Sequence, residues 1–207
     1  VSGNVSFYNQ TKEVGIKPTP SIGGVGLIKD YKKMVTMDFK KIDNLVLVIG
    51  KTEGHIDQSL FARSILDEKN GPPPEVNLFN EKNNGESLLD LINKNYIQSA
   101  HDISLGGLIT AISKMCIQGN KGIKLKKTNN FVNELEYLFS EDQGRYIIEI
   151  KPEDLKEVIN ILDKNSVHYD ELGIITDKEM IINQKTKLTI DELKSYYTNW
   201  LTNYMSA

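Results

Sequence analysis

Polar and glycine residues gather in one short segment that follows an apolar run and precedes a helical pattern. The segment contains His101, Asp102, Ser104, Gly106 and Gly107. Where a strand ends just before a helix, such groups lie beside the free N–H groups of the helix start, which attract anions. Gly106 and Gly107 would let the backbone approach a ligand closely, and Ser104 could cap the helix. Alternatively, Asp102 or Ser104 is an ordinary helix cap and His101 is a hydrogen-bonded structural histidine, so both roles stay open.

A second set of small polar residues lies at the start of the sequence, in the run SGNVS at 2–6. The side-chain oxygen of Asn4 is a ligand that Mg²⁺ accepts, and Gly3 would let a nucleotide approach the backbone. Surface turns use the same residue types. These residues alone are therefore compatible with a nucleotide and metal site or with a turn.

Arg145 follows two acidic residues, Glu141 and Asp142, just before an apolar run. Its planar guanidinium could hold a phosphate or a carboxylate, and a surface ion pair with either neighbour fits the pattern as well. His55 and His168 have no partners at metal-ligand spacing. The sequence contains no Walker-type phosphate loop, no GxGxxG fingerprint and no GxSxG elbow.

Two patterns divide the sequence near Lys41. Glycine and proline interrupt short strand-like pieces at 25–28 and 34–39, and no helix is indicated there. From Leu45 onward, short apolar runs alternate with amphipathic helical patterns, which is typical of a sheet covered by helices. We therefore expect an α+β fold in which residues 41–207 form the main domain and residues 1–40 form the β-rich tail of another.

The apolar run Leu45–Ile49 predicts a central strand buried on both faces. Further strands are predicted at 96–100, 145–150 and 172–175, with a hairpin at 180–188. Helices are predicted at 58–68, between the triple proline and residue 93, from residue 107, at 152–162 and from residue 189. Thr189 and Glu192 form a capping box at the last helix, whose apolar side predicts that Trp200 is buried.

Composition narrows the class of protein. The chain has 207 residues with 39% hydrophobic and 26% charged residues, values typical of globular proteins, and its net charge of −3 gives no field for nucleic acid or membrane. The lysines at 121–127 alternate with Ile123 and Leu125, which favours an exposed edge strand. A single cysteine, Cys116, rules out an internal disulfide and indicates a reducing compartment. Since no apolar run reaches membrane-span length, we expect a cytoplasmic protein.

The motifs, taken together and in order, resemble one family. They are SGNVSFYN at 2–9, PTP at 18–20, GVGLI at 24–28, GPPP at 71–74, SAHDIS at 99–104 with GGL at 106–108, and SEDQGRY at 140–146. These are similar to the synthetase subunit of phosphoribosylformylglycinamidine synthases over nearly the whole chain. The pair SGNVS-x-YN and SAHD-x-S-x-GG is specific, whereas either alone is weak.

This resemblance implies an ATP-dependent ligase of purine biosynthesis. ATP would phosphorylate the formamide oxygen of formylglycinamide ribonucleotide, and ammonia derived from glutamine would displace phosphate. Residues 1–40 would end an ATP-binding domain, and residues 41–207 would resemble the C-terminal domain of aminoimidazole ribonucleotide synthase. By position in the motif, Gly3 would contact ATP, Asn4 would ligate Mg²⁺ and Ser6 would touch the substrate, while the loop from His101 to Gly107 would face the cleft.

The family's catalytic histidines belong to segments absent from this sequence, so the chain alone should be inactive and should contain no catalytic residue. Expected partners are a glutaminase subunit or domain and the upstream ATP-binding domains of the same protein. Leu105 departs from the pattern, because relatives carry a polar residue there. Two alternatives stay open: another member of the superfamily, similar to selenophosphate synthetase or thiamine-phosphate kinase, and a non-catalytic interaction module.

Overall fold

The computed structural model describes residues 10–15, 23–126, 133–184 and 186–206. Contacts divide the chain into two units, residues 1–31 and 32–207. In the described part of the first unit, β1 (Gln10–Thr11) pairs antiparallel with β2 (Val14–Gly15). The strand predicted at 25–28 is wrong, since these residues have no regular secondary structure.

The second unit is built on a seven-stranded mixed sheet with the strand order β4-β6-β3-β7-β5-β8-β9. Neighbouring strands are antiparallel except β5 and β8, which run parallel. The strands are β3 (Leu45–Ile49), β4 (Ile97–Asp102), β5 (Gly122–Leu125), β6 (Tyr146–Ile150), β7 (Tyr169–Thr176), β8 (Glu179–Ile182) and β9 (Thr186–Thr189).

Strand β3 lies inside the sheet, between β6 and β7. Successive side chains of a strand face opposite sides, so Val46 and Val48 join one core cluster and Leu47 and Ile49 join the other. All four side chains are fully buried. The prediction of a central strand buried on both faces is confirmed.

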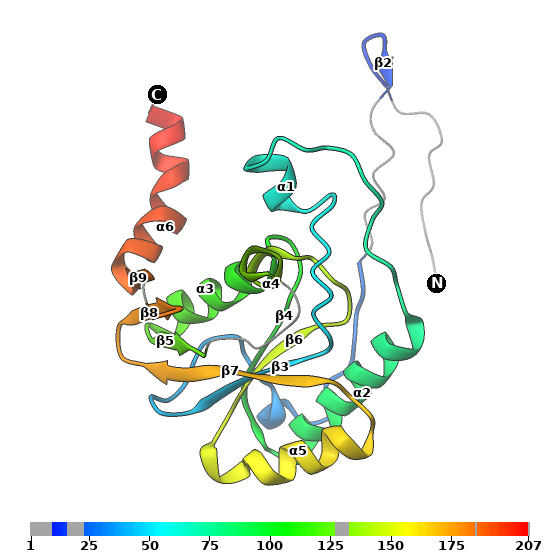
Figure 1. Cartoon of the computed structure of the whole chain (residues 1–207), viewed down its shortest axis with the longest axis vertical. Coiled ribbons are helices and arrows are strands. Elements are labelled where there is room, and N and C mark those ends of the chain that lie inside the picture. The colour runs from blue at the N-terminus through cyan, green and yellow to red at the C-terminus, as the bar shows by residue number, and fades with distance from the viewer. Residues whose placement is uncertain (1–9, 16–22, 127–132, 185, 207) are drawn as a thin grey trace. The chain divides into compact units, whose positions relative to one another are not determined.

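Helices cover both faces of this sheet (Figure 1). One face carries α2 (Leu78–Asn93) and α5 (Leu155–Lys164), which contribute Leu91 and Leu162 to its core. The other face carries α3 (Gly107–Gly119) and α4 (Glu134–Phe139), with Ile112 and Leu138 in the core. The expected α+β class, a sheet covered by helices, is confirmed.

Helix α1 (Leu60–Ser64) is shorter than the helix predicted at 58–68. Gln58 has a φ of 62° and Asp67 a φ of 54°, so both ends of the predicted range leave the helical region. Ser59 caps the short helix by accepting a hydrogen bond from the Ala62 N–H. The helix predicted at 152–162 forms as a 3₁₀ turn, η2 (Pro152–Asp154), followed by α5.

The prediction that the lysine-rich segment forms an exposed edge strand is wrong. Its strand, β5, lies between β7 and β8, with Ile123 and Leu125 buried and Lys124 exposed. The parallel pairing with β8 is a contact between segments far apart in sequence. Alternation of side chains indicates a strand with one polar side, but it carries no information about which strands lie next to it.

Residues 32–40 pack with the second unit. Phe39 is buried in the core and its N–H donates to the Met115 carbonyl at 3.4 Å. The segment starts with a 3₁₀ turn, η1 (Tyr31–Lys33), and the strand predicted at 34–39 does not form. The division by contacts therefore falls about ten residues before Lys41.

Helix α6 (Ile190–Ser206) begins at the predicted capping box. The Thr189 N–H donates to Glu192 Oε2 at 2.8 Å, and the Glu192 N–H donates to Thr189 Oγ1 at 3.2 Å. The predicted burial of Trp200 is wrong, because this side chain is 62% exposed where α6 extends beyond the sheet and its helices (Figure 1). Neither α6 nor any other helix within the described ranges is long and apolar enough to cross a membrane.

Candidate functional site at the end of strand β4

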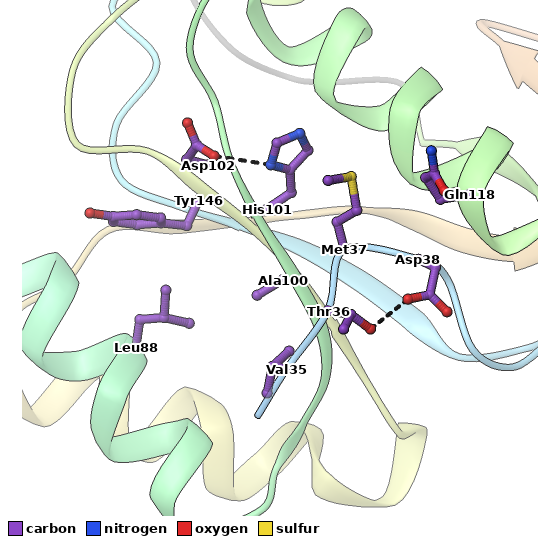
Figure 2. Close-up of a pocket in the computed structure, with 10 residues that line it drawn as sticks. All are labelled: Val35, Thr36, Met37, Asp38, Leu88, Ala100, His101, Asp102, Gln118 and Tyr146. Atoms are coloured by element: carbon purple, nitrogen blue, oxygen red, sulfur yellow. Dashed lines mark hydrogen bonds and ion pairs between the residues drawn. The ribbon is translucent and has the colours of Figure 1, made fainter. Parts of the chain in front are cut away.

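A hollow of about 780 Å³ lies beside the carboxyl end of β4 (Figure 2). Its wall combines the 35–38 segment, the end of β4, and single residues of α2, α3 and β6. The 35–38 segment is held there by the Ala100 N–H, which donates to the Thr36 carbonyl at 3.2 Å. The lining residues are Val35, Thr36, Met37, Asp38, Leu88, Ala100, His101, Asp102, Gln118 and Tyr146. An apolar wall with a few polar groups is typical of small-molecule sites.

His101 and Asp102 form the polar pair of this hollow. His101 Nδ1 lies 3.0 Å from Asp102 Oδ1 (Figure 2), and the carboxylate favours the tautomer that carries its proton on Nδ1. Nε2 is then a hydrogen-bond acceptor. It is buried and has no hydrogen-bond partner within the described part of the chain. Because an unpaired buried polar atom is costly, His101 is the group of this wall that most needs a further partner.

The other ionisable groups of the wall are Asp38 and Tyr146. Partial burial raises the pKa of Asp38, but hydrogen bonds from Lys40 and Thr36 outweigh it and hold that pKa below its usual value. Lys40 Nζ lies 2.6 Å from Asp38 Oδ1. Burial, helped by the charges of Glu81 and Asp102, raises the pKa of Tyr146. At neutral pH the hollow therefore presents an ionised carboxylate and a neutral phenol.

The loop after β4 does not cap α3 as predicted. Gly106 is the residue before the first helical turn, and no side chain caps it, so the capping role predicted for Ser104 is wrong. The Gly106 N–H donates to Glu141 Oε1 at 2.8 Å, and the Gly107 N–H donates to the Ser104 carbonyl at 3.0 Å. These two N–H groups already have partners within the chain.

Both glycines allow a close approach, but to their own chain. Gly107 has a φ of +71°, and a Cβ there would lie 2.7 Å from the Phe139 carbonyl carbon and the Ser140 oxygen. A Cβ on Gly106 would lie 2.4 Å from Thr110 Oγ1. Close packing against the chain itself therefore accounts for both glycines, in place of the close approach to a ligand that the sequence suggested.

Two acidic side chains hold the loops around this site. The sequence pattern did not predict this role for them. Glu141 Oε1 accepts from the Leu60 N–H and the Gly106 N–H, each at 2.8 Å. Asp142 accepts from the backbone N–H groups of residues 53, 54 and 55 at 3.0 to 3.1 Å. The loop after β3 and the loop after β4 are thus both tied to one turn before β6.

Arg145 completes this arrangement from inside the protein. It is 1% exposed, and its guanidinium donates to the Ser140 carbonyl at 2.7 Å and to Thr52 Oγ1 at 3.0 Å. Asp142 lies 3.8 Å away. The expected ion pair with Asp142 is therefore present, but it is buried and not on the surface, and internal hydrogen bonds satisfy the guanidinium donors. The same bonds occupy the planar group that could have held a phosphate.

The family of this domain follows from a comparison of sequences. The family model described as AIR synthase related protein, C-terminal domain, matches residues 41–183. This chain belongs to that family. The matched range contains β4, the loop to α3 and the turn with Glu141 and Arg145, whereas the 35–38 wall of the hollow lies just before it. The family domain alone therefore does not enclose the hollow.

Curated relatives extend the match to nearly the whole chain. The phosphoribosylformylglycinamidine synthase subunit PurL of Pelagibacter ubique is 70% identical over 205 residues, covering 99% of this chain and 28% of that protein. PurL of Bartonella henselae is 40% identical over the same length, with the same shares. The chain thus spans less than a third of these relatives.

Solved structures confirm the fold. Thermotoga maritima PurL complexed with FGAR has a TM-score of 0.65 and 17% identity, covering 78% of this chain and 29% of that chain. Escherichia coli HypE, a hydrogenase maturation protein, has a TM-score of 0.55 and 14% identity, covering 75% of this chain and 52% of that one. At these identities the likeness shows the shared architecture alone.

Of the residues predicted for function, His101 and Asp102 line the hollow, and Ser104, Gly106 and Gly107 do not. Gly3, Asn4 and Ser6 lie outside the described residues, so their predicted roles stay predictions. Within the described ranges, no group of three or more His, Cys, Asp or Glu side chains is placed to hold a metal ion by itself.

Proposed function

We propose that this chain is part of an ATP-dependent carbon–nitrogen ligase that converts formylglycinamide ribonucleotide to formylglycinamidine ribonucleotide. The observation that carries the proposal is the 70% identity to a PurL subunit across 99% of the chain. Thermotoga maritima PurL has been solved in complex with ATP and in complex with FGAR, which supports these two substrates for the longer protein. We place this protein in the cytoplasm, as the expected site of purine biosynthesis.

Each turnover of the proposed reaction consumes one ATP. The glycinamide carbonyl oxygen attacks the terminal phosphorus of ATP, and ADP leaves. It is this oxygen, and not the expected formamide oxygen, because the product keeps its formyl group. Ammonia then adds to the activated carbon, inorganic phosphate leaves with the former amide oxygen, and a proton is lost to solvent. Phosphorylation is needed because an amide oxygen is a poor leaving group, and the charge that develops requires fixed donors or a metal ion. A glutaminase subunit or domain would supply the ammonia.

Within this proposal, the run at 2–6 provides one wall of the nucleotide site. Gly3 contacts ATP, Asn4 gives a side-chain oxygen to Mg²⁺ and Ser6 contacts the ribonucleotide, all by position in the family motif. His101 and Asp102 present polar groups to the cleft and are assigned no chemical step. Since the expected catalytic histidines belong to other segments, the 207-residue chain by itself is inactive.

The Asn4→Ala variant of the longer protein tests this assignment. Water replaces the lost oxygen without holding the phosphates in place, so turnover falls more than substrate affinity, and higher Mg²⁺ restores part of the rate. Steady-state kinetics over a Mg²⁺ series, with a thermal melt of the same variant, give the answer. A lower melting temperature with wild-type turnover at every Mg²⁺ concentration would reduce Asn4 to a turn residue.

A second candidate function is another reaction of the same superfamily. The likeness to HypE supports it at the level of fold, because that protein shares the architecture at 14% identity. A non-catalytic interaction module is the third reading. An upstream ATP-binding domain in the complete reading frame favours the ligase, and a start codon directly before Val1 favours the module.

A further inference from the structure

Helix α6 is packed at its beginning and uncovered along most of its length. Ile190 is buried in the core, and Leu193 packs against the same cluster. Beyond them, six large side chains are exposed. Met205 is one, and the other five are named here the α6 stripe: Tyr196, Tyr197, Trp200, Leu201 and Tyr204. Figure 1 shows the second half of α6 standing away from the sheet and its covering helices.

The α6 stripe continues the face that already packs. At about 100° per residue, its members fall on the same side of the helix as Leu193, while Thr198, Asn199 and Thr202 fall on the other side. The stripe is therefore an extension of the domain's own packing surface. A helix with this much apolar area on one side is stable in water only when another surface covers that side.

The composition of the α6 stripe indicates the chemistry of that surface. Residues 195–207 contain no charged side chain. Tyrosine and tryptophan are enriched in the buried centre of protein interfaces, from which lysine and acidic residues are depleted. Helices that lie on membranes carry lysine or arginine on the polar face. Here the opposite face of residues 195–206 has neither, and apart from Met205 its side chains are those of serine, threonine and asparagine. A protein surface without charge fits the stripe best.

We propose that the α6 stripe docks against an apolar, uncharged surface in the part of the longer protein that lies outside these 207 residues. The match to the family model ends at residue 183, so β9 and α6 lie outside the range that this model describes. The match to the Pelagibacter ubique protein covers 99% of this chain but only 28% of that one, so most of the relative's chain is available as the docking partner.

A high effective concentration favours a partner in the same polypeptide. A surface on the same chain meets the stripe at an effective concentration far above that of a separate protein, so an interface of one helix face suffices. The inference rests on the proposed function in one respect: it assumes that the natural protein is the longer chain. It concerns assembly and does not depend on which reaction the protein catalyses.

Site-specific photo-crosslinking in the longer protein tests this inference. A benzophenone amino acid replaces Trp200, and the matched control places it at Thr202, on the opposite side of the same helix. We expect Trp200→benzoylphenylalanine to form crosslinks within one chain, to peptides outside the 207 residues, and the Thr202 variant to form few. Crosslinks at dimer mass, to another protein, or to no peptide outside the 207 residues would overturn the proposal.

Amide hydrogen exchange gives an independent readout on the same protein. Docking protects the amides of 195–206, and Trp200→Gln speeds their exchange by about tenfold, while Thr202→Gln leaves it unchanged. Equal exchange in wild type and both variants contradicts docking. Ligase assays of the same preparations keep the two proposals apart: protected α6 amides without ligase activity refute the function alone, and activity with unprotected amides refutes the docking alone.

Discussion

At the scale of single residues, Glu149 joins three segments of the domain: residues 40–44, β4 and its own strand β6. This fully buried carboxylate accepts from the Lys40 N–H at 2.8 Å, the Lys41 N–H at 3.0 Å, and Asn44 Nδ2 and Ser99 Oγ at 2.7 Å each. It therefore fixes the segment that leads from the hollow into β3 and anchors it to β4. A buried charge is tolerated here because four donors replace its water.

Replacing Glu149 by Gln removes the charge and turns an NH₂ group toward at least one donor. We expect a loss of about 2–4 kcal/mol in the free energy of unfolding, since hydrogen bonds to a buried charge are lost or strained together. Urea unfolding of the variant measures it. Asp90→Asn, which removes an exposed carboxylate paired with Lys94 on α2, is the matched control. Equal stability of the two variants would show that the four contacts contribute little.

Cys116 gives a pH-dependent prediction at the same scale. Burial raises the pKa of its thiol from 9.0 to about 12. Between these values the folded chain keeps a proton that the unfolded chain loses, so this group's contribution to stability falls as pH rises through that window. The native thiol should resist a disulfide reagent at pH 8 and react fully in urea. Because the sequence has one cysteine, rapid labelling of the native chain would contradict its burial directly.

At the scale of elements, two glycines differ in whether the structure requires them. Gly107 has no room for a side chain, whereas Gly85 has. A Cβ on Gly107 would meet backbone atoms at 2.7 Å, whereas on Gly85 in α2 the nearest atom is 3.8 Å away. We expect Gly107→Ala to destabilise the domain by about 2–4 kcal/mol and Gly85→Ala to stabilise it by about 0.5–1 kcal/mol. Thermal unfolding of both variants tests the pair. A tolerated Gly107→Ala would mean that α3 can move from α4 at little cost.

Much of the element inventory follows from local sequence pattern. The apolar run of β3, the 3.6-residue spacing in α3 and the capping box at Thr189 are set by neighbouring residues, and each was predicted. The predictions are wrong where the structure depends on contacts between segments that are far apart in sequence. The neighbours of β5 depend on β7 and β8, and the exposure of Trp200 depends on the surface that meets α6. Periodicity identifies an apolar face but carries no information about its partner.

The candidate site shows the same limit. His101 and Asp102 could be singled out because they end an apolar run before a helix. Asp38 and Tyr146 could not, because each lies in a segment that the sheet brings to the hollow from far away in sequence. The sequence does place two acidic residues, Glu141 and Asp142, and an arginine directly before a buried strand. The burial of Arg145 shows that this group has a structural role.

At the scale of the whole molecule, the described domain has a core of its own and two incomplete surfaces. The hollow contains a buried His101 nitrogen that has no partner within the described ranges, and α6 presents an apolar stripe that nothing in those ranges covers. Both features are expected of one domain of a larger protein, whose remaining domains would supply the missing partners. The share of the relatives that the chain spans is consistent with this account.

The central claim is that the chain contributes to an amidine-forming ligase only as part of the longer protein. The direct measurement is formation of formylglycinamidine ribonucleotide by mass spectrometry, with ATP, Mg²⁺, formylglycinamide ribonucleotide and ammonium chloride as nitrogen donor. We predict product and ADP in equal amounts from the longer protein and neither from the 207-residue chain. Product from the chain alone, or ATP consumption by the longer protein without any amidine, would contradict the account.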